Sequence, residues 1–550
     1  MTANIEEPSA PSKRRVLIIG LDGVTWDVLT PLVNEGRLPN IKRVIETGAW
    51  GVLQSTTPPI TPAAWTTFLT GVHPGKHGII DFERYNVNTN KLTFNSTQCL
   101  DHVRNIWRIL GDHGLKIGSV NVPMTYPPVE VNGFLVSGFE TPGPSADFVY
   151  PPSLRADILS RWADPTLKTN WKRKLFGGDA LFRKNLDYMA RSFHQGAAMT
   201  KFLGDKCGWD ALMVVLKLTD NIQHKTWKYI DARWTDRNPR RTEMVKQCFC
   251  ESDKSVGDLL DYAEAHNATV MIVSDHGHGS LEGKVQPNLL LQKWGYLALT
   301  GHSAQSGTRL RHVLDRWTGK TKRFVREGNI AQDLAVDFNK TRACVMHAGM
   351  AGFVYINLRD RQPCGIVKQN EYESLRDELR DRFLGSDCRA TNPEGRIIQL
   401  FNAAHKPEEL YGCSRQDQPW MPDLILIPHD GLAVVRKIRG THAVNWLSYH
   451  KIEGTHRPQG IFAATGPGIA QKEGLRAQIA DCAPTLLALL GLPIPENMDG
   501  KVLTEIFDTQ PEITYETATT TTAAQGGKEV YSEKELQQVT ERLADLGYLE

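Results

Sequence analysis

Short apolar stretches recur along the chain and predict the strands of a buried sheet. They cover residues 16–19, 116–122, 134–137, 211–216 and 270–273. Apolar stretches of this kind are typical of strands covered on both faces, as in a parallel sheet. Helical patterns at 26–35, 103–110, 160–205 and 256–265 alternate with them. We therefore predict an α/β fold with a mostly parallel central sheet flanked by helices.

Three of these stretches lead into an aspartate. Asp22 follows the first stretch, Asp220 follows the fourth and Asp275 follows the last. In an open parallel sheet the carboxyl ends of the strands lie along one edge, where ligands bind. We therefore expect the three carboxylates to converge at that edge.

The regular alternation breaks down after residue 282 and returns at 423–427 and 460–464. We predict a core made of residues 15–300 and 405–508, with an inserted cap region over 301–404 that carries a basic stretch at 308–326. Residues 1–14, rich in Pro, Ser and charge, are predicted to be a disordered leader. Residues 509–550 are predicted to be a linker and a C-terminal amphipathic helix, which begins with a capping box at Ser532 and whose apolar stripe is Leu536, Val539, Leu543 and Leu546.

Composition limits the partners and the location of the protein. Lys+Arg 64 against Asp+Glu 62 leaves a formal net charge of +2, so overall charge gives no argument for a nucleic-acid partner. The nine cysteines show no paired CxxC spacing, which favours reduced thiols over disulfides or a thiolate zinc site. No apolar run approaches the roughly 18 residues of a membrane span. We expect a soluble, cytoplasmic protein with no specific nucleic-acid partner and no membrane span.

Histidines accompany the aspartates. Asp220 and His224 are four residues apart, a spacing that places both on one face of a helix, Asp275 and His276 adjoin at the end of a strand, and His456 lies in a turn-like segment. Each residue alone is more often a helix cap or a surface histidine. Together, and mostly at strand ends, they predict a metal site. Carboxylate with imidazole suits zinc, or manganese where carboxylate weighs more.

A hydroxyl precedes a short helical segment in ITPAAWTTFLTGVHPGKHGIIDF, residues 60–82. Thr61 comes directly before Pro62, so its ordinary interpretation is a helix N-cap. Beside a metal site the same hydroxyl is a candidate nucleophile, because two ions about 4 Å apart can hold the attacking and leaving oxygens of a displacement at phosphorus. The glycine-rich turn at 20–23 lacks the GxGxxG spacing of dinucleotide sites.

Five motifs resemble those of a known family, in the same order. They are LDG at 21–23, ITPAAWTTFLTGVHPGKHGI at 60–79, TDNIQH at 219–224, SDHG at 274–277 and GTHRPQGIF at 454–462. The set resembles the alkaline phosphatase superfamily, in particular its type I phosphodiesterase/nucleotide pyrophosphatase branch and the bacterial and archaeal phosphohydrolase relatives. The resemblance implies an alkaline-phosphatase-like catalytic core and two divalent metal ions. By motif, one ion is held by Asp22, Thr61, Asp275 and His276, with Thr61 also the nucleophile, and the other by Asp220, His224 and His456.

One position departs from the family pattern. In the nucleotide pyrophosphatases, an asparagine that holds a non-bridging phosphate oxygen follows the HGIID-like run, whereas here Phe82 follows it. The oxyanion donor must then be another group, such as a backbone N–H, a cap residue or Lys76. The Cys/Ser-x-Pro-x-Arg motif of the sulfatases is not supplied by residues 61–65, which disfavours sulfate esters.

The sequence therefore predicts a phosphodiesterase or nucleotide pyrophosphatase that acts through a phospho-threonine at Thr61, with two zinc or manganese ions. Its substrate would be a small phosphate ester or a nucleotide-like molecule. Phosphomonoesterase or phosphomutase activity on the same site is one alternative, and a catalytically inactive, metal-bound binding scaffold is another. The oligomeric state and the substrate stay open at this point.

Overall fold

The apolar stretches of the sequence form a central sheet of nine strands, ordered β22-β2-β21-β9-β1-β8-β5-β6-β7. The strands are β1 (Arg15–Gly20), β2 (Ala49–Gln54), β5 (Ile117–Val122), β6 (Gly133–Ser137), β7 (Val149–Tyr150), β8 (Ala211–Val215), β9 (Ala268–Val273), β21 (Gln459–Thr465) and β22 (Lys472–Gln478). From β9 to β6 all neighbours are parallel, whereas β21 is antiparallel to both of its neighbours. The predicted mostly parallel sheet is confirmed.

The computed structural model describes residues 14–100, 102–166, 171, 178–300, 334, 336–347, 349–413, 420–518 and 530–546. The predicted basic stretch at 308–326, nearly all of the predicted leader and the second half of the predicted linker lie outside the described residues. Among the described residues, no helix combines the length and the apolar character needed to cross a membrane. All nine cysteines are free thiols.

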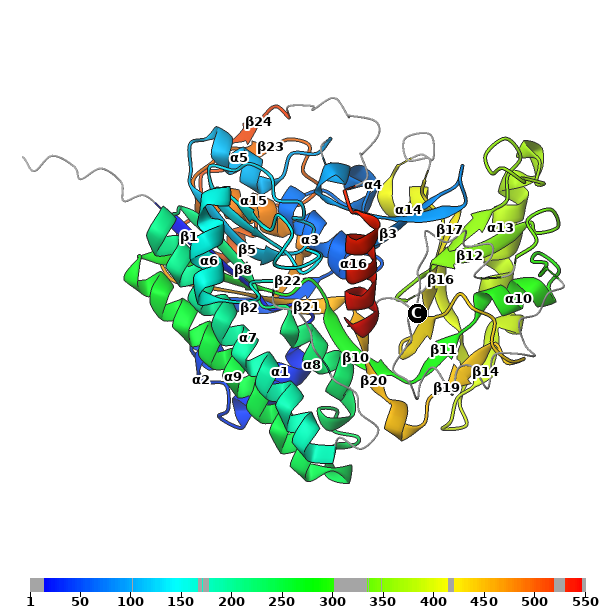
Figure 1. Ribbon diagram of the computed structural model, residues 1–550, viewed down its shortest axis with the longest axis horizontal. Helices are drawn as coiled ribbons and strands as arrows, with labels where there is room; N and C mark the ends of the chain where they lie inside the picture. The colour runs from blue at the N-terminus through cyan, green and yellow to red at the C-terminus, as the bar shows by residue number, and fades with distance from the viewer. Residues whose placement is uncertain are drawn as a thin grey trace, which may run out of the picture.

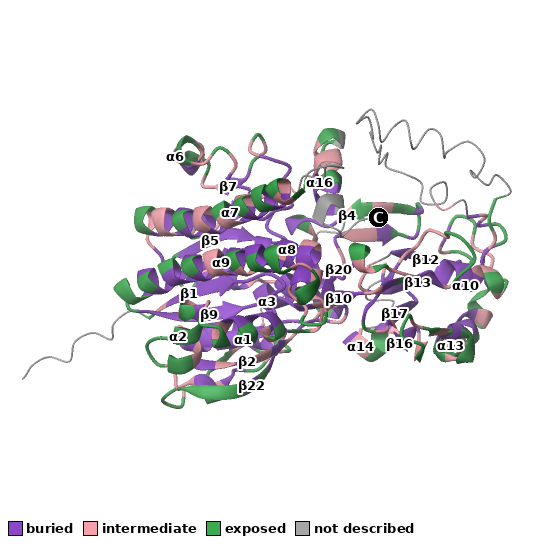
Figure 2. Ribbon diagram, turned by 90° about the horizontal axis from the view of Figure 1, so that it is seen from below, coloured by how far each residue is buried: buried purple, intermediate pink, exposed green. Residues whose placement is uncertain are grey.

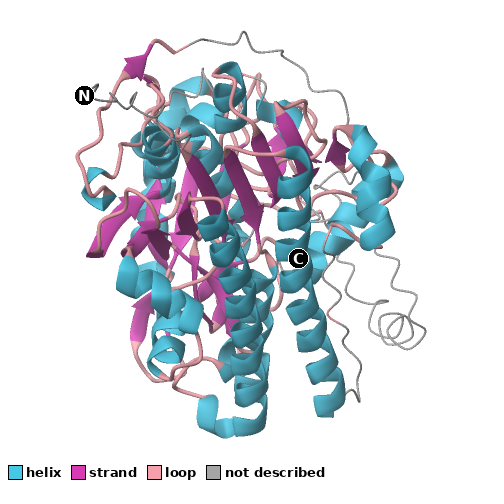
Figure 3. Ribbon diagram, turned by 90° about the vertical axis from the view of Figure 1, so that its left-hand side faces the viewer, coloured by secondary structure: helices cyan, strands magenta, loops and turns pink. Residues whose placement is uncertain are grey.

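Helices cover both faces of the sheet. In β1, Leu17 and Ile19 belong to one hydrophobic core, whereas Val16 and Ile18 belong to another on the opposite face. The first core is covered by α1 (Trp26–Asn34), α2 (Pro39–Thr47), α7 (Gly178–Cys207) and α9 (Pro239–Ala265), and the second by α3 (Thr61–Thr70), α5 (Ile106–Asp112) and α15 (Cys482–Leu489). Figures 1 and 3 show these helices flanking the strands, and Figure 2 shows the buried strands between them. Double burial explains why the run in β1 is apolar without alternation.

Three helices begin elsewhere than the sequence predicted. The helix expected at 160–205 is α7, which begins at Gly178, and residues 162–166 are not helical. The helix expected at 256–265 is the C-terminal part of α9, which begins at Pro239 because the Asn238 side chain caps it by accepting from the backbone N–H of Arg241. The helix expected at 103–110 is α5, which Asn105 caps by accepting from the backbone N–H of Arg108. In α9 and α5 the capping asparagine sets the first turn.

A second sheet lies beside the core and has the order β12-β13-β17-β16. Its strands are β12 (Ala343–His347), β13 (Gly352–Ile356), β16 (Phe401–His405) and β17 (Leu424–Pro428), and its own hydrophobic core includes side chains of α10 (Pro287–Lys293) and α13 (Tyr372–Leu384). Asp423, just before β17, is buried and ion-pairs with Arg361 at 2.8 Å. The boundaries predicted for the inserted region stay a prediction, and the shared hydrophobic core and this ion pair favour moving them outward to include α10 and β17.

Smaller elements complete the molecule. Small two-stranded sheets are formed by β10 (Gly277–Leu281) with β20 (Glu453–Arg457), β3 (Glu83–Asn86) with β4 (Lys91–Phe94), β14 (Arg389–Thr391) with β15 (Ile397–Gln399), and β23 (Ile494–Pro495) with β24 (Tyr515–Glu516). In a three-stranded sheet, β11 (Gly283–Val285) lies between β18 (Leu432–Val434) and β19 (Val444–Trp446). The other α-helices among the described residues are α4 (Pro74–His77), α6 (Arg155–Arg161), α8 (Leu218–Thr226), α14 (Pro407–Tyr411) and α16 (Glu533–Leu546). In Figure 1, β10 and β20 lie between the core and the second sheet.

The predicted amphipathic helix is α16, and it docks on the core of its own chain. Ser532 and Glu535 form the predicted capping box. Val539 and Leu543 are buried in a cluster with Phe82 and three other residues of the core, Ile60, Ala63 and Phe139. The helix therefore packs against the two residues that flank Thr61 and Pro62. The side chain of Leu546, the last residue of the predicted stripe, lies outside what the structure describes.

Truncation of Leu543 tests this docking. Loss of a buried leucine side chain costs about 2–5 kcal/mol, so Leu543→Ala should speed amide hydrogen exchange along α16 while the central strands keep their protection. Glu541→Ala, on the exposed face of the same helix, is the control and should leave the exchange of α16 within a factor of about two. Equal exchange in the two variants would show that the helix does not depend on this contact.

Candidate metal centre

The three aspartates lie at the ends of neighbouring strands, as the sequence predicted. The central strand, β1, pairs in parallel with β8 on one side and with β9 on the other. Asp22 follows β1, Asp275 follows β9, and Asp220 lies in the first turn of α8, after β8. All three side chains are fully buried.

Asp220 lies among three imidazoles, and we call this set the Asp220 cluster. Its members are Asp220, His224, His278 and His456. The Nε2 atoms of the three histidines, in that order, lie 3.2, 3.3 and 3.5 Å from Asp220 Oδ1. Asp220 and His224 are one turn apart on α8, as their spacing predicted.

The tautomers of these imidazoles follow from their backbone contacts. Nδ1 faces the carbonyl oxygen of Gly454 at 2.9 Å in His224, of Pro59 at 2.9 Å in His456 and of Gly23 at 2.7 Å in His278. A carbonyl oxygen can only accept, so Nδ1 carries a proton in each ring, and in the neutral form of the ring Nε2 presents its lone pair. The Nε2 atoms of His224 and His456 are 3.0 Å apart, close enough for both to bind one cation.

Asp22, Asp275 and His276 form a second group, which we call the Asp275 cluster. His276 Nε2 lies 3.3 Å from Asp275 Oδ2 and 4.0 Å from Asp22 Oδ1. Its Nδ1 lies 3.1 Å from the carbonyl oxygen of Gly277, which again leaves the Nε2 lone pair directed at the carboxylates.

Thr61 adjoins the Asp275 cluster. Its Oγ1 lies 3.3 Å from His276 Nε2, and its side chain is fully buried. The prediction that Thr61 also caps the helix is wrong, because the N-cap of α3 is Ile60 and Thr61 is the first helical residue. The hydroxyl is therefore directed at the cluster from the N-terminal end of α3.

Burial controls the charge of the carboxylates. It raises the pKa of Asp22 to about 7 and that of Asp275 well above its usual range. Burial also acts on Asp220, but His224 and then its other neighbours, among them Lys217, outweigh burial and hold the pKa of Asp220 well below its usual range. A cation in the Asp275 cluster would favour the ionised form of both carboxylates.

Burial also favours the neutral form of three of the imidazoles. It lowers the pKa of His276 and His278 well below the usual range, and it lowers the pKa of His456. Neutral imidazole is the form that binds a metal ion, so these side chains need lose no proton at neutral pH before they bind one.

Several buried atoms of the two clusters have no hydrogen-bond partner in the described part of the chain. They are Asp22 Oδ1, Asp275 Oδ2 and His278 Nε2. Buried polar atoms are nearly always satisfied, and an unsatisfied acceptor in the interior is costly. Within each cluster the candidate ligand atoms lie within 4.8 Å of one another. The residues therefore fit bound divalent ions.

Two histidines, His456 and His278, have positions that the sequence did not predict, and both positions follow from strand pairing. His456 lies in β20, so its predicted turn-like setting is wrong. In the β10–β20 pair His278 lies directly opposite His456, and His278 was not predicted at all. The signal for it was its position two residues after His276, next to the predicted ligands. Pairing between segments so far apart in the chain leaves no local pattern.

Lys76 and Phe82 have other surroundings than a phosphate-binding role requires. Lys76 Nζ ion-pairs with Asp499 at 2.5 Å, so its predicted role as the oxyanion donor stays a prediction. Phe82 is buried with its ring edge-to-face on Phe139, at a centroid distance of 5.6 Å. A positive charge that the sequence did not indicate lies at the Asp220 cluster itself, because Lys217 is buried and its Nζ lies 3.8 Å from Asp220 Oδ2.

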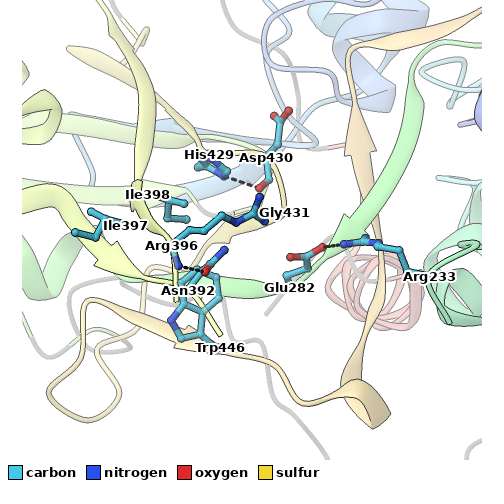
Figure 4. A pocket seen from close by; sticks show the side chains of 10 residues that line it. All are labelled: Arg233, Glu282, Asn392, Arg396, Ile397, Ile398, His429, Asp430, Gly431 and Trp446. Carbon is cyan, nitrogen blue, oxygen red and sulfur yellow. Dashed lines mark hydrogen bonds and ion pairs between the residues drawn. The ribbon is translucent and has the colours of Figure 1, made fainter. Parts of the chain in front are cut away.

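A separate cavity of about 320 Å³ lies beyond β10, near the second sheet (Figure 4). Four charged side chains lie on its wall, and two of them, Arg233 and Glu282, form an ion pair at 2.8 Å; the other two are Arg396 and Asp430. No residue of either cluster lines it. The cavity is therefore separate from both clusters.

Comparison with solved structures gives two similarities. A phosphonoacetate hydrolase from Sinorhizobium meliloti 1021, in complexes with phosphonoformate and with phosphonoacetate, is 14% identical with a TM-score of 0.53, and the match covers 86% of this chain and 94% of that chain. Murine ectonucleotide pyrophosphatase/phosphodiesterase 5 is 13% identical with a TM-score of 0.47, over 87% of this chain and 95% of that chain. A sequence search of curated proteins gave no match. The first similarity shows the alkaline-phosphatase-like fold.

A family model described as type I phosphodiesterase / nucleotide pyrophosphatase matches residues 16–459. This span contains Thr61 and every residue of the two clusters. Members of the family use two divalent metal ions, which agrees with two adjacent clusters of buried ligands. The chain therefore belongs to the type I phosphodiesterase/nucleotide pyrophosphatase family of the alkaline phosphatase superfamily and is a metal-dependent phosphohydrolase.

Proposed function

We propose that the chain hydrolyses small phosphodiesters through a covalent phospho-threonine at Thr61. The observation that carries the proposal is the position of Thr61 Oγ1, 3.3 Å from His276 Nε2 and beside Asp22 and Asp275. A threonine hydroxyl is a weak nucleophile, and coordination by a metal ion is one of the ways in which such a group is activated.

The reaction divides into two displacements at phosphorus. In the first, Thr61 Oγ1 loses its proton and forms a bond to phosphorus, and the bond from phosphorus to the leaving oxygen breaks, so that an alcohol departs with one proton. In the second, water attacks the phosphorus, the bond to Thr61 Oγ1 breaks, and the hydroxyl regains its proton as a phosphomonoester leaves. Divalent ions held by the two clusters would supply positive charge that lowers the pKa of the hydroxyl and offsets charge on the phosphoryl group.

Residues of the chain also supply positive potential for the phosphate. Thr61 is the first residue of α3, so the N-terminal end of the helix dipole favours negative charge beside its hydroxyl. Lys217 contributes a buried ammonium group 3.8 Å from Asp220 and acts on the pKa of Asp22 and Asp275 as well, lowering both. We assign to these two features the role that the asparagine plays in the nucleotide pyrophosphatases.

The donor sets favour zinc. Three imidazoles and one carboxylate in the Asp220 cluster suit zinc, whereas the Asp275 cluster, with two carboxylates and the Thr61 hydroxyl nearby, also suits manganese. We therefore propose two zinc ions, with manganese able to replace the ion of the Asp275 cluster.

Substitution of the nucleophile tests the mechanism. Thr61→Ala should lower kcat for bis(p-nitrophenyl) phosphate by about 10³-fold or more, because the covalent route is lost. Thr61→Ser retains a hydroxyl and should keep measurable turnover. We also expect wild type to cleave the diester at least about 10-fold faster than p-nitrophenyl phosphate. Full activity in Thr61→Ala would exclude Thr61 as nucleophile, faster cleavage of the monoester would favour a phosphomonoesterase, and cleavage of neither ester with either metal would favour an inactive scaffold.

Metal removal tests the clusters by a readout other than turnover. Because the ions bind the native state only, a free metal concentration of 100 times Kd should stabilise the protein by about 2.7 kcal/mol per site, seen as a higher Tm of the zinc-loaded over the chelated protein. Asp220→Asn should lose much of this Tm increase. Glu282→Gln, a matched change at the separate cavity of Figure 4, should keep it. An equal increase in wild type and Asp220→Asn would place the metal elsewhere.

A further inference from the structure

His278 lies at the centre of the Asp220 cluster although none of the family motifs in the sequence includes it. Its ring centroid is 4.7 Å from that of His224 and 5.2 Å from that of His456, and its side chain is fully buried. The ring projects from β10 toward Asp220, whose Oδ1 lies 3.3 Å from His278 Nε2. Three imidazoles therefore surround one carboxylate.

The ring of His278 is held in the orientation that a metal ligand needs. Its Nδ1–H donates to the carbonyl oxygen of Gly23 at 2.7 Å, which fixes the tautomer and leaves the lone pair on Nε2. Nε2 has no hydrogen-bond partner among the described residues. The free nitrogen of the buried ring thus faces a carboxylate oxygen, Asp220 Oδ1, at 3.3 Å.

The backbone at Gly23 makes room for this ring. Gly23 has a φ of 69°, and a Cβ there would lie 2.6 Å from His278 Cε1 and 3.1 Å from Asp220 Oδ1. A side chain at residue 23 would therefore displace the imidazole or the carboxylate. The turn after β1 is built so that His278 can approach Asp220 closely.

Packing alone does not account for this arrangement. The ring does lie on Trp227, at a centroid distance of 6.3 Å and an interplanar angle of 26°, and an apolar ring of the same size would make that contact equally well. A histidine that only filled space would have no reason to direct Nε2, which has no hydrogen-bond partner among the described residues, at Asp220 Oδ1 from 3.3 Å. A cation bound by both Nε2 and the carboxylate accounts for this orientation.

We propose that His278 is a fourth protein ligand of the metal site in the Asp220 cluster. The inference rests on the proposed two-metal centre and goes beyond it, because it makes the two sites unequal. The Asp220 cluster supplies one carboxylate and three imidazoles, the four-ligand set of a closed zinc site, whereas the Asp275 cluster supplies three ligands and keeps a position for Thr61 and substrate. The first equivalent of zinc then binds the Asp220 cluster and is the last to be removed.

Metal retention in a variant tests the assignment. Dialysis against a chelator is first adjusted so that wild type loses one of its two zinc ions and elemental analysis finds one ion per chain. His278→Phe, which preserves the ring on Trp227, should bind that ion at least about 10-fold more weakly, a loss seen even for groups that only orient a ligand. His347→Phe, a buried histidine of β12 packed on Phe353 at 5.3 Å, is the control and should match wild type. Equal retention in all three proteins overturns the assignment.

X-ray absorption on wild type gives a second measurement that needs no variant. With one equivalent of zinc, the outer-shell scattering should fit three imidazoles, and a fit to two imidazoles would overturn the assignment even where His278→Phe fails to fold. The outcomes also separate this inference from the proposed function. If wild type binds no zinc, both the proposed function and the role of His278 are overturned. If wild type binds two ions and hydrolyses the diester, but the first site contains only two imidazoles, only the role of His278 is overturned.

Discussion

The burial of three carboxylates at one edge of the sheet is the constraint on which the rest of the site depends. Asp22, Asp220 and Asp275 lie at the ends of adjacent strands, with Lys217 as a buried positive side chain beside them. The effective penalty for an uncompensated buried charge is several kcal/mol. The imidazoles of His276, His278 and His456, whose pKa values burial lowers, add lone pairs rather than charge and cannot offset it. The groups that make the centre reactive are thus the same groups whose charge the native state has to balance.

The peptide of Gly23 connects the two clusters. Its N–H donates to Asp275 Oδ1 at 3.0 Å, and its carbonyl oxygen accepts from His278 at 2.7 Å and from Gln223 at 2.8 Å. One turn after β1 therefore fixes the position of a ligand from each cluster relative to the other. The LDG motif has a physical basis beyond the aspartate it carries, since a positive φ and the lack of a Cβ at residue 23 are both required.

What the sequence could predict was local. Continuous apolar stretches predicted the parallel strands, and the strand ends predicted that Asp22, Asp220 and Asp275 would converge. The spacing of Asp220 and His224 predicted their common helix face. The setting of His456 and the presence of His278 depend on pairing between β10 and β20, which are more than 170 residues apart in the chain. Such pairing is decided by tertiary packing, so no local pattern encodes it.

Phe82 connects the C-terminal helix with the charge at the metal centre. Its ring packs edge-to-face on Phe139, and α16 covers this pair beside Thr61. An asparagine at residue 82 would place an amide in that apolar cluster, where burial without partners is costly. Lys217 Nζ also contacts this pair, 3.6 Å from the Phe139 ring centroid, and lies 3.8 Å from Asp220. The departure from the family pattern, the docking of α16 and the buried lysine are therefore parts of one arrangement, in which an aromatic pair holds the cation beside the centre.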